Sequence, residues 1–120
     1  MDEYPPADVL SKAVARAARL LDVRQAKLTD ILGLSTVAAA RLVAGGYELQ
    51  SDRAEWELAA WFVRIFRSLD TLVGHGDEAH LWLKSPNRAL GETPADLLES
   101  AEGLIRVLQY LDAVEHRIAP

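Results

Sequence analysis

The sequence predicts an all-α fold, and three observations support this prediction. Apolar residues recur at the three- and four-residue spacing of helices along most of the 120 residues. The alternating apolar and polar runs that are typical of strands are nearly absent. Glycine and proline stand between the periodic segments, where helices are expected to end. We expect an N-terminal helical unit over residues 1–50, a central connecting helix over 51–76 and a C-terminal helical unit over 77–120.

Composition limits the class of protein. Half of the residues are hydrophobic, so the chain can bury a core, either as one compact domain or as two small units that share one. The absence of cysteine excludes disulfides and thiolate metal sites. No apolar run approaches the roughly 20 residues that cross a membrane. The acidic, proline-rich start lacks the basic and apolar regions of a signal peptide, so we expect a cytoplasmic protein without membrane partners.

Three short helices are predicted in the N-terminal unit. The first carries an apolar face made of Val9, Ala13, Ala17, Leu20 and Leu21. The second covers Arg24 to Leu32 and stops at Gly33, because glycine accepts the left-handed conformation of a helix end. The third runs from a Ser35 cap to Ala44 and ends at the glycine pair that follows.

The second and third of these helices resemble a helix-turn-helix, in which the second helix enters the major groove of DNA. Gly33 permits the turn and Leu34 can fill the helix crossing. The residues expected to contact DNA are Arg24, Gln25, Lys27, Ser35, Thr36 and Arg41, and Ala39 is a further candidate. Few of these side chains can read base edges. A motif retained only as scaffold is the alternative, and specific binding would require self-association.

The charge distribution bears on the same question. Residues 9–45 hold six basic and two acidic residues, a net charge of +4, inside a chain whose net charge is -5. A basic segment in an acidic protein favours an anionic partner such as operator DNA. An ordinary solvated helix face is the competing interpretation, because these cations are not dense.

The central helix is predicted from Ser51, as its N-cap, to about Val73. Its apolar stripe consists of Ala54, Leu58, Trp61, Phe62, Ile65, Leu69 and Leu72. Trp61 is therefore assigned to the core, whereas Trp56 falls outside the stripe. Trp56 and Trp82 are either anchors of an interface or ordinary packing residues.

Proline and asparagine punctuate the C-terminal unit. A helix from Asp77 must stop near Ser85, because Pro86 disfavours helix at the residue before it. Asn87 is expected to fix the following turn through its own backbone. Thr93 and Pro94 suit the cap and first position of a short helix over 94–100. A last helix is predicted from Gly103 to about His116.

No constellation in the sequence points to catalysis or to metal. His75 and His80 lack metal-ligand spacing, and no serine has an evident catalytic partner. The carboxylate pairs lie near helix N-termini, where capping explains them. We therefore expect no enzyme, no cofactor and no metal site.

The C-terminal unit, from about His80 to His116, resembles the Xre/MbcA/ParS family of antitoxins, the partners of RES-domain toxins. The resemblance rests on Trp82-Leu83, Ser85-Pro86-Asn87-Arg88, Leu90, the segment from Thr93-Pro94 to Leu97, Gly103, Val107-Leu108 and Leu111. A preceding Xre-like helix-turn-helix, in a chain of this length, fits the same family.

This resemblance implies an antitoxin of a type II toxin–antitoxin system. Its C-terminal unit would bind the cognate RES-domain toxin, block access to the toxin's NAD site and so stop NAD degradation, while the N-terminal unit represses the operon. The residues implied in toxin binding are Trp82, Lys84, Ser85, Pro86, Asn87, Arg88, His116, Arg117, Ile118, Ala119 and Pro120. Two alternatives stay open: a DNA-binding transcriptional regulator without a toxin, whose C-terminal unit serves dimerisation, and an adaptor that no longer binds DNA.

Overall fold

The computed structural model describes residues 6–118 and, in that range, contains seven helices and no strand. The all-α prediction is therefore confirmed. The helices are α1 (Ala7–Leu20), α2 (Gln25–Leu32), α3 (Thr36–Ala44), α4 (Ala54–Val73), α5 (Asp77–Lys84), α6 (Pro94–Leu97) and α7 (Ala101–Ile118). None of them is long and apolar enough to cross a membrane.

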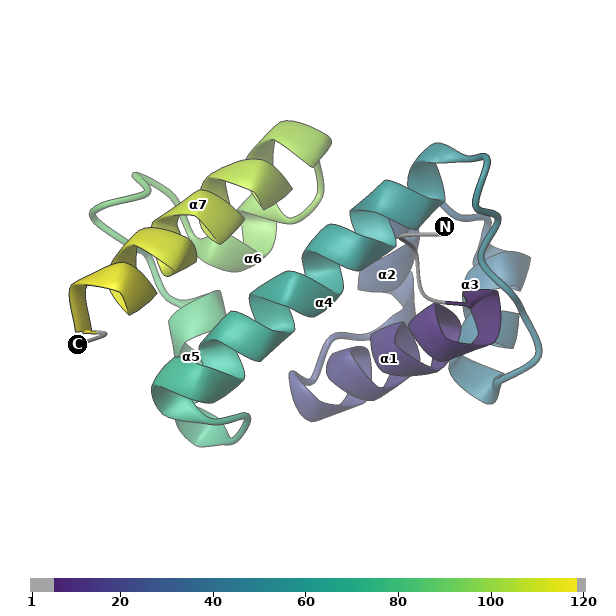
Figure 1. The fold of residues 1–120 in the computed structure, drawn as a ribbon, viewed down its shortest axis with the longest axis horizontal. Helices are drawn as coiled ribbons and strands as arrows, with labels where there is room; N and C mark the ends of the chain where they lie inside the picture. Colours follow the sequence, from purple (N-terminus) through teal and green to yellow (C-terminus); the bar gives the residue numbers. More distant parts are fainter. Residues whose placement is uncertain (1–5, 119–120) are drawn as a thin grey trace.

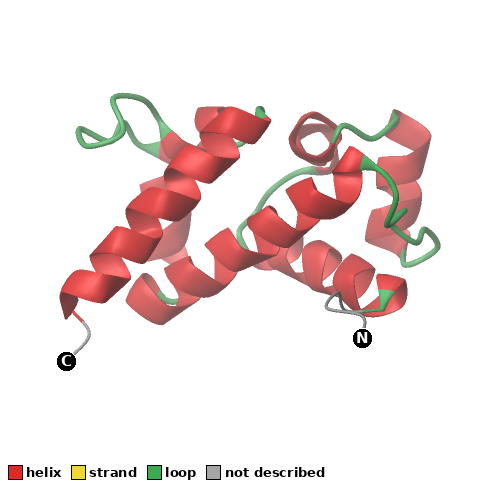
Figure 2. Cartoon of the chain, turned by 45° about the horizontal axis from the view of Figure 1, so that its top comes forward, coloured by secondary structure: helices red, strands yellow, loops and turns green. Residues whose placement is uncertain are grey.

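Helix α4 organises the molecule. It runs diagonally through the view in Figure 1, with α1, α2 and α3 on one side and α5, α6 and α7 on the other. It packs against α1 and α2 on the first side and against α5 and α7 on the second. In both views α4 and α7 lie side by side and are inclined in the same direction (Figure 2). A single cluster of buried apolar side chains extends from Leu10 in α1 to Leu111 in α7.

The position of α4 between two groups of helices corrects the assignment of its tryptophans. Trp56 is only 3 % exposed and belongs to the core, whereas Trp61 is partly buried at its edge. A helix that is covered on two sides buries a broader band than a one-sided stripe predicts. The interpretation of Trp56 as an interface anchor is therefore wrong.

The start of α4 also differs from the prediction. The helix begins at Ala54, with Arg53 at the cap position, and not at Ser51. Glu55 explains the delay, because its buried carboxylate accepts hydrogen bonds from the Tyr47 hydroxyl (2.7 Å) and the Gln50 N–H (2.9 Å). These hydrogen bonds hold the segment that precedes α4 in a turn. Burial, together with the hydrogen bond to Glu55, raises the pKa of the Tyr47 phenol.

The buried face of α1 is centred differently from the expected one. Val9 is 51 % exposed, and the buried positions include Leu10 and Val14 as well as the predicted Ala17. The shift accompanies a buried polar residue, Ser11. Its hydroxyl donates to the Ala7 carbonyl (2.7 Å) and accepts from the Leu49 N–H (3.0 Å), which ties the α3–α4 connection to α1.

The substitution Ser11→Ala should lower the free energy of unfolding by about 1–3 kcal/mol, because it leaves the buried Leu49 N–H without its acceptor. Urea denaturation measures the change. The matched control is Ser51→Ala in an exposed turn, which should lie within about 0.5 kcal/mol of the parent. A Ser11→Ala protein as stable as that control would show that this bond does not hold the connection.

Candidate functional site

The first candidate surface is the connection between α5 and α6, residues 85–93. As predicted, α5 ends at Ser85, which takes an extended conformation before Pro86. The Asn87 side chain accepts from the Leu90 N–H (3.1 Å), and the Asn87 carbonyl accepts from the Gly91 N–H (2.8 Å). Gly91 is left-handed, at φ 77°, a conformation that glycine adopts without steric cost. The predicted role of Asn87 in fixing the turn is confirmed.

Helix α7 contacts this connection through Arg106, which was not among the predicted site residues. The Arg106 guanidinium donates to the Leu90 carbonyl (2.6 Å) and lies 3.6 Å from the Glu92 carboxylate. Asn87 and Glu92 also form an isolated antiparallel bridge. Hydrogen bonds within the loop and the contacts of Arg106 from α7 therefore fix the conformation of the loop. Nothing in the local sequence around Arg106 indicates this contact, because its partners lie at least 14 positions away.

The short helix α6 begins where predicted but differs from the prediction in its cap and in its last residue. Thr93 occupies the cap position and Pro94 the first turn, but the Thr93 side chain makes no capping hydrogen bond. The helix covers four residues and not the seven predicted, and α7 begins at Ala101. The early end follows from the next turn, in which the Ser100 hydroxyl accepts from the Gly103 N–H (3.0 Å) and so begins α7.

Trp82 joins the two helices beside the loop. Its ring stacks on Tyr110 of α7, with centroids 6.2 Å apart and planes inclined by 16°. Both side chains are partly buried, so part of their surface remains accessible. On the outer side of α5, Leu81 is 68 % exposed, next to Trp82 in the sequence. Leu81 was not among the predicted site residues, although its place on the face shared by Asp77 and Lys84 could have indicated it.

The C-terminal end of α7 lies at the same end of the molecule as the 85–93 loop (Figure 1). The Ser68 hydroxyl of α4 donates to Glu115, which fixes the last turns of α7. His116 Nδ1 lies 3.2 Å from the Asp112 carbonyl oxygen, and Arg117 is exposed. Helix α7 ends at Ile118. The remaining predicted contacts, Ala119 and Pro120, lie outside the described residues.

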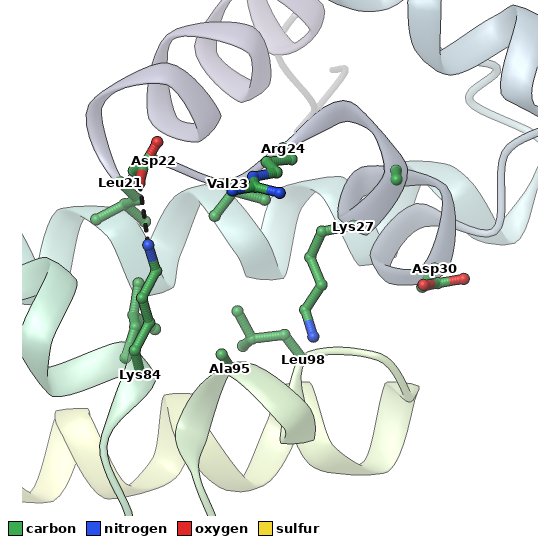
Figure 3. Close-up of a pocket in the computed structure, with 11 residues that line it drawn as sticks. Leu21, Asp22, Val23, Arg24, Lys27, Asp30, Lys84, Ala95 and Leu98 are labelled. Carbon is green, nitrogen blue, oxygen red and sulfur yellow. Dashed lines mark hydrogen bonds and ion pairs between the residues drawn. The ribbon is translucent and has the colours of Figure 1, made fainter.

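A cavity of about 480 Å³ lies between the two groups of helices. Its lining contains Lys84, which was predicted to bind the toxin, and Arg24 and Lys27, which were predicted to bind DNA. Figure 3 shows Lys84 of α5 and Lys27 of α2 extending toward it from opposite sides. Lys84 Nζ donates to Asp22 (3.0 Å), and Lys27 pairs with Glu99. Its lining is completed by Leu21, Val23, Ala26, Asp30, Leu83, Ala95 and Leu98. Two ion pairs thus connect the N-terminal helices to the C-terminal ones.

The Lys84 ammonium, which donates a hydrogen bond to Asp22, lowers the pKa of that carboxyl group. The contribution of the pair is therefore present at neutral pH and is lost as the pH falls through the lowered pKa. We expect Lys84→Gln to raise the Asp22 pKa toward its ordinary value, as measured by NMR titration of the carboxyl carbon. Arg88→Gln, an exposed cation in the neighbouring loop, is the control. An unchanged Asp22 pKa in Lys84→Gln would contradict the ion pair.

The helix-turn-helix has the predicted geometry. Gly33 ends α2 at φ 68°, Leu34 is buried at the crossing, and the Ser35 hydroxyl accepts from the Ala38 N–H (3.0 Å). Ser35 and Thr36 are exposed at the start of α3, but Ala39 is fully buried, so its suggested DNA contact is wrong. The reason is helical spacing, which turns position 39 toward the core.

The predicted cations of this motif have different surroundings. Arg24 and Gln25 are exposed at the start of α2, whereas Lys27 is directed to the cavity and paired with Glu99. Arg41 is exposed, and its guanidinium donates to the Gly46 carbonyl (2.9 Å). Within residues 6–118, no group of three or more His, Asp or Glu side chains is arranged to hold a metal ion.

These features define the class of protein: a small all-α protein with a helix-turn-helix and a compact C-terminal helical unit. Residues 68–117 match the antitoxin Xre/MbcA/ParS C-terminal toxin-binding domain. This C-terminal part of the chain is therefore similar to the toxin-binding domain of the Xre/MbcA/ParS antitoxins.

Two individual proteins are similar to the chain. "Antitoxin Xre" of Photorhabdus laumondii subsp. laumondii is 31 % identical over 90 residues, which are 73 % of this chain. The chain spans 60 % of the length of that relative. A chain in the crystal structure of the M. tuberculosis MbcT–MbcA toxin–antitoxin complex superimposes with a TM-score of 0.69 at 28 % identity, over 93 % of this chain and 98 % of that one. The fold is thus shared along nearly the whole length.

Proposed function

We propose that this protein is the antitoxin of a type II toxin–antitoxin system and acts in the cytoplasm, without catalytic activity of its own. It binds a RES-domain toxin that consumes NAD and blocks the toxin's active site. The observation that carries the proposal is the match of residues 68–117 to a toxin-binding domain, on a unit whose loop is internally fixed. A preformed loop favours tight association, because little conformational entropy is lost when the partner binds.

The proposed toxin-binding surface combines α5, the 85–93 loop and the end of α7. Trp82 and the exposed Leu81 supply apolar contact area, and large side chains of this kind carry much of the energy of protein interfaces. Lys84, Ser85, Pro86 and Arg88 follow them in the sequence. Arg117, at the last exposed turn of α7, is suited to reach a carbonyl-lined or anionic site in the toxin. Asn87 contributes by shaping the loop.

The helix-turn-helix supports a second role, repression of the antitoxin's own operon. Arg24, Gln25, Ser35, Thr36 and Arg41 are exposed on α2 and α3. Phosphate contacts from the arginines would supply affinity, and the start of α3 would meet base edges. Self-association would place two such motifs on neighbouring half-sites.

Co-expression tests the proposal. We expect a RES-domain reading frame beside this gene; its product should arrest growth when expressed alone, and this chain should restore growth and copurify with that product. Cellular NAD, measured during toxin expression, should fall and then recover when the antitoxin is induced. A double substitution in the surface, Leu81→Asp with Trp82→Ala, should weaken the complex, whereas Val9→Asp, an exposed apolar residue of α1, should not. Growth arrest that this chain does not relieve would refute the antitoxin function.

A further inference from the structure

Val37 is a largely exposed apolar residue of the helix-turn-helix. It lies in the first turn of α3, and 69 % of its surface is exposed, more than for any other large apolar residue in the described part of the chain. A lone exposed valine is ordinary on a protein surface. Its position is not, because the N-terminal residues of the second helix are the ones that meet base edges in a helix-turn-helix.

The neighbouring side chains leave few groups that can read DNA. The Ser35 hydroxyl caps α3 by accepting from the Ala38 N–H, and Ala39 is buried. The Arg41 guanidinium is hydrogen-bonded to the Gly46 carbonyl at the far end of the helix. At the start of α3, Thr36 and Val37 are therefore the exposed side chains that make no hydrogen bond within the described residues, and both are available to DNA.

The chemistry of Val37 selects one feature of the major groove. An apolar side chain complements the C5-methyl group of thymine, which no other base presents. We propose that Val37 contacts a thymine methyl group in the operator and so determines specificity at that base pair. This inference rests on the proposed repressor function and names the base that it reads.

Charge favours DNA over a second copy of the chain as the occupant of this surface. Lys27 is paired with Glu99, so the exposed charges of this motif are Arg24 and Arg41 against Asp30, a net charge of +1. A two-fold dimer through α3 would place this basic patch against itself, and facing like charges oppose association. A polyanion gains from the same charges.

The test compares DNA with and without the methyl group. The promoter fragment upstream of the gene is amplified with either dTTP or dUTP, which gives the same base sequence with thymine or uracil. The antitoxin, with its toxin present, should bind the thymine fragment more tightly by about four-fold for each methyl contacted. Val37→Ala should reduce this preference by weakening binding to thymine DNA alone, because the shorter side chain makes less contact with the methyl group. Alanine favours helix at this exposed position, so the variant should fold, as checked by circular dichroism.

Val43→Ala is the matched control, because Val43 is 50 % exposed on the same helix but lies near its other end. It should keep the full preference for thymine. Equal binding to both fragments by the parent, or a preference that Val37→Ala leaves undiminished, would overturn the assignment of Val37 while leaving repression intact. No binding to either fragment would overturn repression itself and this inference with it. Sedimentation that shows Val37→Ala disrupting a dimer, with the methyl preference unchanged, would assign Val37 to a protein interface instead.

Discussion

Gly103→Ala is expected to lower the free energy of unfolding by about 3 kcal/mol. A Cβ atom at this position would lie 1.8 Å from the Leu97 carbonyl oxygen and 2.6 Å from its carbon. These are backbone atoms at the end of α6, so no side-chain rotation relieves the overlap. Alanine would otherwise favour the helix by up to about 1 kcal/mol, which makes the direction of the change diagnostic.

Thermal or urea denaturation of the two proteins measures this effect. Gly46→Ala is the control, because its added Cβ would meet only the Arg41 carbonyl oxygen at 3.8 Å, an ordinary contact. We expect a small change there. A Gly103→Ala protein that is as stable as the parent would mean that α6 and α7 do not approach each other as closely as the structure shows.

Truncation after Glu115 is expected to abolish toxin neutralisation with little effect on the fold. It removes His116, Arg117 and the last three residues, which are the tail proposed to enter the toxin. It keeps Glu115 and therefore the hydrogen bond that Ser68 donates to it. Growth rescue on co-expression measures the function, and circular dichroism with thermal denaturation measures the fold.

Two results would separate the contributions of the tail. Arg117→Ala in the full chain should weaken rescue if the guanidinium occupies the toxin's site, whereas His116→Ala should matter less, since His116 lies against its own helix. A truncated protein that still rescues growth would show that the tail does not block the toxin. The α5 and loop surface would then carry the inhibition alone.

Local signals were sufficient to predict much of the fold. Gly33 and Ser35 identified the helix-turn-helix, and Pro86 and Asn87 identified the end of α5 and the turn after it, because each acts on its own backbone. The contacts between the units could not be predicted in this way. The pairs Lys27–Glu99 and Lys84–Asp22 join residues 72 and 62 positions apart, and no local pattern selects one acidic partner among many.

The conformation of the loop in the candidate site could be predicted from the sequence, but the contacts that hold the loop and α5 in place could not. The loop sequence indicated where α5 ends and how the next turn is fixed, and the partner-binding role of the loop stays a prediction. The contact of Arg106 with the Leu90 carbonyl and the stacking of Trp82 on Tyr110 both require the angle between helices, which the sequence does not encode locally. Trp56 was misplaced for the same reason, because only the packed structure shows that α4 is covered on both sides.

The unbroken course of α4 has a consequence for how a larger assembly is built. A helix of 20 residues is about 30 Å long, which is close to one turn of B-form DNA. Because α4 packs against both groups of helices, it acts as a spacer of set length between α3 and the end that carries the 85–93 loop. If the chain binds DNA and toxin as proposed, it would hold each at its own end of α4, in a relative orientation that the fold fixes before binding.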